Sequence, residues 1–83
     1  MPTSGGHEMT ARSASALGRA LRAARQAQGL TQSELAERSR TNRFSIAQLE
    51  TGDATKAIEK LFDTLAALDL ELVVRPRQGW KAR

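Results

Sequence analysis

The sequence predicts a mainly α fold of four helices, two of which form a helix-turn-helix, followed by one C-terminal strand. Two features indicate the helical part. Between Gly29 and Gly52 two short amphipathic stretches are joined by a tight turn, and on both sides of this segment apolar residues recur at helical spacing. A third feature indicates the strand, because after Leu68 the apolar residues begin to alternate along the chain.

The chain of 83 residues is long enough for one small domain with a modest core. Residues 1–14 are rich in Thr, Ser, Gly and Ala without a sustained period, which predicts a disordered N-terminal tail. The helix-turn-helix domain is expected over residues 15–69, a strand over residues 70–75 and a flexible basic tail over residues 76–83.

The first helix is expected from Ala16 to Gln28, where the apolar side chains share one face. Gly29 follows it as a residue suited to a positive φ angle, which ends the helix. Three arginines project away from the apolar face, and they serve either as phosphate ligands or as a solvated surface. These arginines are Arg19, Arg22 and Arg25, and the apolar face consists of Leu17, Ala20, Leu21, Ala24 and Ala27.

The second helix is expected to begin after Thr31, because Glu34 three residues later completes a capping box with it. Asn42 is the expected cap of the third helix, and residues 39–41 between the two helices are too few to form anything but a turn. The expected buried faces consist of Leu35 and Ala36 in the second helix and of Ile46 and Leu49 in the third.

A fourth helix is expected from Lys56 to Leu68, with the strongest amphipathic stripe of the chain. Over residues 70–75 the apolar positions alternate, which is typical of a half-buried strand, and Pro76 ends it. The alternatives are that residues 70–75 extend the fourth helix or form an ordered coil. The stripe of the helix contains Ile58, Leu61, Phe62, Leu65 and Leu68.

A single strand leaves its backbone N–H and C=O groups without partners, and the chain offers no second candidate strand. We therefore expect the same strand of a second subunit to pair with it, antiparallel across a two-fold axis. The expected product is a homodimer held by an intersubunit β-ribbon. Its dimerisation residues would be Leu70, Leu72, Val73 and Val74.

The charge distribution favours a polyanionic partner for the first half of the chain. From Arg12 to Arg43 the chain carries seven arginines and two glutamates, whereas acids predominate between Glu50 and Glu71. In a helix-turn-helix the first of the two helices crosses the DNA backbone, so donors near its start face phosphate. The candidate phosphate ligands are Thr31, Gln32, Arg38, Arg40 and Arg22.

The third helix is the candidate recognition helix, whose N-terminal residues lie against base edges in the major groove. Arg43 can form a bidentate pair with guanine and Gln48 with adenine, while Phe44 and Ala47 suit a thymine methyl group. Arg43 and Gln48 could also be ordinary exposed residues. Phe44 could instead be buried under the turn as part of the core.

Composition argues against several other functions. There is no cysteine and the single His7 lies in the expected tail, so we expect no metal site and no cofactor. No apolar stretch approaches the roughly 20 residues of a membrane span, so we expect a soluble, cytoplasmic protein. The carboxylates are scattered and no Gly-rich phosphate loop is present, so an enzyme is not expected.

The segment from Gly29 to Gly52 resembles the Xre family of helix-turn-helix domains, the lambda-repressor-like fold of phage repressors and Cro proteins. The shared residues are the GLTQ-x-ELA opening, the S-I-x-Q-L-E helix and the closing glycine. The resemblance covers roughly residues 16–68. It implies that Gln32 contacts phosphate and that the family's base-reading positions are occupied by Arg43, Phe44 and Gln48.

Two residues of the inter-helix turn depart from the family pattern. Arg40 stands where the family usually has glycine, so a left-handed conformation there would be mildly strained. Thr41 stands where an apolar residue is common, so the turn is expected to bury less surface.

The helix that runs directly into a strand after Gly52 resembles the HipB-type antitoxins, small dimeric Xre proteins that partner a HipA-like serine/threonine kinase toxin. The resemblance implies a repressor that binds palindromic operator DNA, controls its own operon and neutralises the kinase. Glu59 and Asp63 then become candidate toxin contacts, with solvated charge as the alternative. Trp80 is a further candidate, and it could instead pack on its own dimer ribbon or be disordered.

Two other functions fit the same sequence. A stand-alone Xre-type transcriptional regulator would use the same DNA-reading residues without a toxin. A protein-binding adaptor would keep the fold without DNA affinity, and Arg43 and Gln48 at reading positions argue against it.

Overall fold

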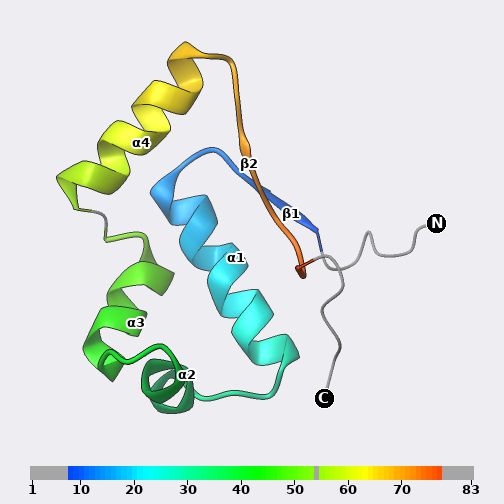
Figure 1. Ribbon diagram of the computed structural model, residues 1–83, viewed down its shortest axis with the longest axis vertical. Coiled ribbons are helices and arrows are strands. Elements are labelled where there is room, and N and C mark those ends of the chain that lie inside the picture. The colour runs from blue at the N-terminus through cyan, green and yellow to red at the C-terminus, as the bar shows by residue number, and fades with distance from the viewer. Residues whose placement is uncertain (1–7, 54, 78–83) are drawn as a thin grey trace.

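The computed structural model describes residues 8–53 and 55–77 (Figure 1). The order of the elements in these ranges is β1 (Met9–Ala11), α1 (Ala14–Ala27), α2 (Gln32–Arg38), α3 (Arg43–Thr51), α4 (Lys56–Ala67) and β2 (Leu72–Val74). The fold is mainly helical with a short two-stranded sheet, in agreement with the expected helix-turn-helix class. Helix α1 packs mainly on α3 and on β1, and α2 packs on α3.

The sheet joins the two ends of the described chain. Strand β1 pairs antiparallel with β2, and Ala11 lies opposite Leu72. The expectation of a disordered tail over residues 1–14 is therefore wrong for Met9–Ala11, and residues 1–7 lie outside the described part. The sequence signal was absent because three residues are too few to show alternation, and their pairing partner is more than 60 positions away.

The existence of β1 removes the reason for pairing β2 with a second subunit. The backbone groups on one edge of β2 have partners in the same chain, so the statement that no second strand exists is wrong. The strand is also shorter than expected, because it begins at Leu72 rather than at Leu70. Leu72 and Val74 are half-buried, whereas Leu70 and Val73 are exposed. Dimerisation through residues 70–75 therefore stays a prediction, without the unpaired strand that supported it.

Each helix begins at a capping side chain. The hydroxyl of Thr31 accepts a hydrogen bond from the Glu34 N–H at 3.0 Å, and the Glu34 carboxylate accepts from the Thr31 N–H at 2.8 Å. The expected capping box is thus confirmed, and Asn42 caps α3 as predicted. Ser13 and Thr55 cap α1 and α4 in the same way. The helix starts were readable from the sequence because each depends on one local side chain.

Each helix is followed by a residue with a positive φ angle. Gly29 and Gly52 have φ angles of 71° and 80°, while Arg40 and Asp69 have 60° and 59°. The next N–H after each of these residues bonds to the carbonyl five positions earlier, as in Leu30 to Arg25 at 3.1 Å and Thr41 to Ala36 at 2.9 Å. Arg40, which stands where the resembled family usually has glycine, thus adopts the left-handed conformation that was expected to be mildly strained there.

Helices α1 and α3 approach closely at Gly18. A Cβ atom at this position would lie 2.4 Å from the carbonyl oxygen of Leu49 and 2.6 Å from that of Glu50. Only glycine permits this backbone contact, because the atoms in the way belong to main chain that cannot rotate aside. This role was not predictable from the pattern of residues, since Gly18 stands inside an ordinary helical period.

The core is small and contains few large side chains. Its buried apolar residues are Ala11, Ala20, Ala36, Ile46 and Phe62. The expectation that Leu49 faces inward with Ile46 is wrong, because Leu49 is 46% exposed. In the α4 stripe Phe62 is buried, whereas Leu61 and Leu68 are exposed. A helical period identifies an apolar face, but it does not show how much of that face a neighbouring element covers.

The left-handed residue Arg40 provides a test of the turn. Replacement of Arg40 by glycine is expected to raise the free energy of unfolding by about 1 kcal/mol, because glycine adopts a positive φ angle without steric cost. The same change at Arg22, an exposed helical position of α1, should lower it by about 1 kcal/mol. Urea unfolding followed by circular dichroism measures the free energy of unfolding of both variants. If Arg40→Gly and Arg22→Gly changed it in the same direction, the left-handed conformation of Arg40 would be contradicted.

Candidate nucleic-acid interface

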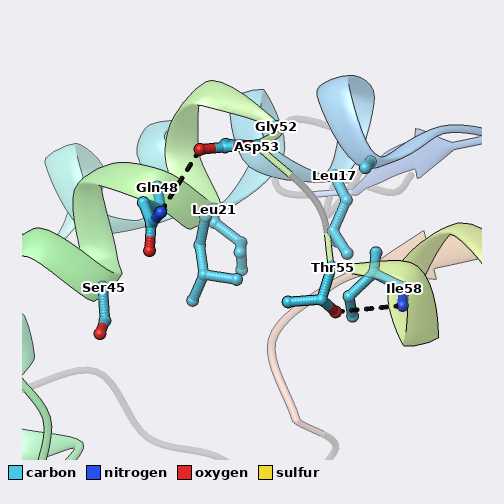
Figure 2. A pocket seen from close by; sticks show the side chains of 10 residues that line it. Leu17, Leu21, Ser45, Gln48, Gly52, Asp53, Thr55 and Ile58 are labelled. Atoms are coloured by element: carbon cyan, nitrogen blue, oxygen red, sulfur yellow. Dashed lines mark hydrogen bonds between the residues drawn. The ribbon is translucent and has the colours of Figure 1, made fainter.

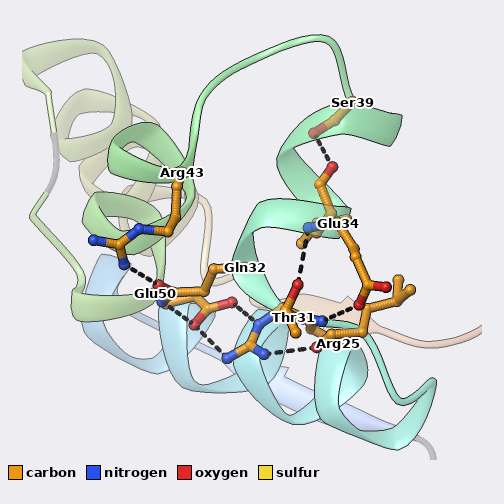
Figure 3. A network of polar contacts seen from close by, with 9 residues as sticks. Arg25, Thr31, Gln32, Glu34, Ser39, Arg43 and Glu50 are labelled. Carbon is orange, nitrogen blue, oxygen red and sulfur yellow. Dashed lines mark hydrogen bonds and ion pairs between the residues drawn. The ribbon is translucent and has the colours of Figure 1, made fainter.

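A buried ion pair joins the first helix to the candidate recognition helix (Figure 3). The Nε atom of Arg25 in α1 lies 2.6 Å from Oε2 of Glu50 in α3, and Nη2 donates to Oε1 at 3.0 Å. The two side chains are only 10% and 4% exposed. The third guanidinium donor, Nη1, bonds to the carbonyl oxygen of Leu30 at 2.8 Å. One arginine therefore holds both α3 and the connection between α1 and α2.

The ion pair continues into a chain of hydrogen bonds that reaches the start of α3. The amide nitrogen of Gln32, at the start of α2, donates to Oε1 of Glu50 at 3.0 Å. The amide oxygen of Gln32 accepts from Nη1 of Arg43 at 3.0 Å. Figure 3 shows these side chains lying between the three helices. We call the set of Arg25, Gln32, Arg43 and Glu50 the polar network.

The charges of the polar network are stabilised by its own contacts. The hydrogen bonds from Arg25 hold the pKa of Glu50 below its ordinary value of 4.5, although burial opposes the shift. The Gln32 amide and the nearby charge of Arg22 lower this pKa further. The hydrogen bond with Glu50 raises the pKa of Arg25 in turn. Both groups therefore remain charged at neutral pH, and each neutralises the other inside the fold.

The outer members of the network keep donors for a further partner. The amide of Gln32 carries two N–H donors and gives one to Glu50. The guanidinium of Arg43 carries five N–H donors and gives one to Gln32. Gln32 is half-buried, and Arg43 is exposed. The network therefore fixes the direction of both side chains without using up their capacity to donate.

The exposed side of α3 carries an unusual aromatic residue. Phe44 is 68% exposed, so the alternative in which it is buried under the turn is wrong. Ala47 and Gln48 are half-buried beside it. The Gln48 amide nitrogen donates to Oδ2 of Asp53 at 3.3 Å, which Figure 2 shows at the end of α3. Arg43 and Phe44 thus lie at the exposed start of α3, and Ala47 and Gln48 lie about one turn further along the helix.

The other predicted phosphate ligands lie at exposed positions. Arg22 is exposed on α1, Arg38 is exposed at the end of α2, and Arg40 is exposed in the turn between α2 and α3. Thr31 is exposed, and its hydroxyl oxygen already accepts the capping bond from Glu34. Arg25, in contrast, is no candidate for a surface ligand, because it is buried with Glu50.

Sequence reasoning missed Glu50, the residue at the centre of the polar network. A signal was available, because Glu50 follows Ile46 by four positions and so lies on the same buried face of the helix. An acid on a buried face requires a cationic partner. Glu50 was instead grouped with the other acids that predominate up to Glu71.

The predicted toxin contacts lie apart from this interface. Glu59 and Asp63 are exposed on α4, and Trp80 lies outside the described residues. Among the helices of the described part, none combines the length and the apolar character needed to cross a membrane. Within the same residues no group of three or more potential metal ligands occurs.

Comparison with known proteins identifies the family. The helix-turn-helix domain family matches residues 16–74, from the first turn of α1 to the end of β2. The chain belongs to this helix-turn-helix family. The match extends beyond the expected residues 16–68 and includes the second strand of the sheet.

A curated relative supports a regulatory role for the family. The chain is 43% identical over 58 residues to y4dL of Sinorhizobium fredii, described as an uncharacterized HTH-type transcriptional regulator. The aligned part covers 70% of this chain but only 30% of the relative, so the chain spans less than a third of that protein's length. No solved structure matches the chain at a significant level. The family and this relative support a DNA-binding regulator and leave the antitoxin role unsupported.

The buried carboxylate of Glu50 predicts a specific loss of stability in acid. The pKa of Glu50 is lower in the folded state than in the unfolded state, so on acidification the unfolded state binds a proton first. The stabilising contribution of the Glu50 carboxylate is therefore present above pH 4.5. It disappears as the pH falls through the folded-state pKa. Glu50→Gln should lower the free energy of unfolding at pH 7 by about 3–5 kcal/mol, because the charge of Arg25 stays buried. It should also flatten the acid dependence.

The matched control is Glu37→Gln, a change of the same kind at an exposed position of α2. It should alter the free energy of unfolding by no more than about 0.5 kcal/mol. Thermal unfolding from pH 3 to pH 7 measures both variants. If Glu50→Gln kept the acid dependence of the parent chain, another group would be responsible for it.

Proposed function

We propose that this chain is a sequence-specific DNA-binding transcriptional repressor that reads the major groove with α3. The observation that supports the proposal is the polar network. It anchors Arg43 to Gln32, and through Gln32 to a buried ion pair, at the exposed start of the helix. A side chain held in place before binding loses less conformational entropy when it contacts a base.

Each reading residue has a distinct chemical role in this proposal. Arg43 donates two hydrogen bonds to O6 and N7 of guanine. Phe44 contacts the methyl group of a thymine, which gives its 68% exposed ring an apolar partner. Ala47 is small enough to let the helix approach the bases. Gln48 pairs with adenine, and its bond to Asp53 determines which way the amide points.

Phosphate contacts from the neighbouring elements hold the helix in register on the duplex. The second N–H of Gln32 and the hydroxyl of Thr31 donate to phosphate oxygens at the start of α2. The exposed Arg22, Arg38 and Arg40 neutralise further phosphates, and this part of the affinity depends on salt rather than on sequence.

The antitoxin role is a finer proposal that rests on the resemblance to HipB-type proteins. The exposed Glu59 and Asp63 on α4 support a partner-binding surface away from α3. In that role the chain would repress its own operon and neutralise a HipA-like kinase. The alternative, a stand-alone regulator, is supported by the relative from Sinorhizobium fredii, which is described only as a transcriptional regulator. Co-purification with a kinase encoded by the neighbouring gene separates the two roles.

Arg43 and Arg38 are expected to contribute to DNA binding in different ways. On a duplex selected from random sequences, Arg43→Ala should cost about 1–3 kcal/mol and relax the preference at one base pair. Arg38→Ala should weaken binding about equally on all sequences and reduce the slope of log K against log salt by about 1. Gel shifts at several salt concentrations measure both. If no duplex bound even at low salt, the adaptor alternative would be favoured.

The contact between Phe44 and a thymine methyl group can be tested by changing the DNA. Replacement of that thymine by uracil removes only the methyl group, so it should weaken binding of the parent chain and leave binding of Phe44→Ala unchanged. Such non-additivity is the signature of a direct contact. If the effects of the two changes simply added, Phe44 would not be the residue that reads the methyl group.

A further inference from the structure

A groove with a volume of about 430 Å³ lies between α1 and the end of the sheet. Three segments that are distant in the sequence form its walls, namely β1, the second half of α1 and residues 74–77. The pairing of β1 with β2 places Met9 directly opposite Val74. We call this space the α1–sheet groove. Its apolar lining consists mainly of Met9, Ala20, Ala23, Ala24, Ala27 and Val74.

The groove stays open because α1 lines it with four alanines. An alanine side chain ends at Cβ, so none of the four extends far from the helix. Ala20 is buried, whereas Ala24 and Ala27 are exposed, so the groove opens toward the end of the helix. Its volume lies within the range of about 300–1,000 Å³ that is usual for small-molecule pockets. The chain therefore has space there for a small ligand.

The polar groups of the groove are cationic or neutral. Gln28, Arg75 and Arg77 line it, and none of its described lining residues is acidic. The Nη1 atom of Arg75 lies 3.8 Å from Oε2 of Glu8, which is too far for a hydrogen bond. Within residues 8–53 and 55–77 no ion pair involves Arg77. Both guanidinium groups therefore keep donors for an anion.

The end of α1 opposes these positive charges only weakly. It borders the groove at Ala27 and Gln28, and a helix C-terminus carries only about half a negative charge. Its last carbonyl groups also accept hydrogen bonds from the N–H groups of Gln28, Gly29 and Leu30. The two arginine charges outweigh this contribution, so the groove favours an anion over a cation.

We propose that the α1–sheet groove binds a small amphipathic carboxylate, that is, a monocarboxylic acid with an apolar body. The carboxylate accepts hydrogen bonds from Arg75 and Arg77, because guanidinium groups match its planar geometry. Gln28 supplies an amide donor beside them. The apolar body lies against the alanines of α1 and against Met9 and Val74. Binding thus removes from water the apolar surface that the chain itself leaves open.

The groove is separate from the surface that is proposed to read DNA. Figure 1 shows α3 and the sheet on opposite sides of α1. Gly18 and Arg25 face α3 from one side of α1, whereas Ala20, Ala24 and Ala27 point to the other side. A ligand can therefore enter the groove without touching α3. The inference goes beyond the proposed function and does not depend on it.

The experiment is a titration of the full ¹⁵N-labelled chain with octanoate, followed by the amide signals in NMR spectra. Octanoate should cause saturable shifts that are largest at Ala23, Ala24 and Val74. Octanamide has the same apolar body without the charge, so it should bind at least about tenfold more weakly. Arg77→Gln should weaken octanoate binding by a similar factor. The matched control Lys60→Gln, exposed on α4, should leave octanoate binding unchanged.

A second pair of variants tests the space rather than the charge. Ala24→Phe places a ring in the groove and should abolish octanoate binding. Because Ala24 is exposed, the helix should tolerate the larger side chain, and circular dichroism checks that the helical content is kept. Ala57→Phe, at an exposed position of α4, should bind octanoate as the parent chain does. Equal binding by both variants would place the ligand elsewhere and overturn the proposal.

The titration distinguishes the carboxylate from other occupants of the groove. If octanoate caused no saturable shift up to its solubility limit, the groove would not be a carboxylate site. Equal affinities for octanoate and octanamide would show that the arginines do not recognise the charge, which also overturns the proposal. If octanoate bound only to a chain that ends at Arg77, the groove would be assigned to residues 78–83 instead of a ligand.

Discussion

The fold depends on one buried charge pair. Arg25 and Glu50 lie 2.6 Å apart with almost no solvent access, and the same guanidinium holds the carbonyl of Leu30. Such a pair adds little net stability compared with apolar side chains of the same size, but its geometry is demanding. Because Gly18 lets α3 approach the backbone of α1, the pair has one arrangement in which both charges are satisfied. It therefore specifies the relative position of the helices more than it strengthens their association.

The same charge pair connects the interior to the surface that is proposed to read DNA. From Glu50 the hydrogen bonds pass to Gln32 and then to Arg43. Helix α3 thus contributes two side chains to the network, and α1 and α2 contribute one each. A residue that cannot reach DNA, such as Arg25, thus determines the direction of one that can. Mechanically, α3 is not an independent reading element, because its exposed start and its buried end are held by the same set of contacts.

Local features of the sequence were predictable, and features that depend on distant pairing were not. The caps at Thr31 and Asn42 follow from side chains within a few positions of each other. Strand β1 does not, because Met9–Ala11 forms a strand only through pairing with β2 at the other end of the chain. The exposure of Leu49 and the partner of Glu50 were missed for the same reason, since periodicity locates a face but not what lies against it.

The sheet joins the two ends of the domain within a single chain. Since β1 supplies the partner of β2 and the family match continues to residue 74, the sheet belongs to the domain rather than to an appended dimerisation arm. It ties the end of α4 back to the start of α1, where Ala11 is fully buried. The end of the chain is thereby satisfied within one copy, whereas the leucines between α1, α3 and α4 are not. The pairing of β2 therefore gives no reason to place a second subunit at this strand.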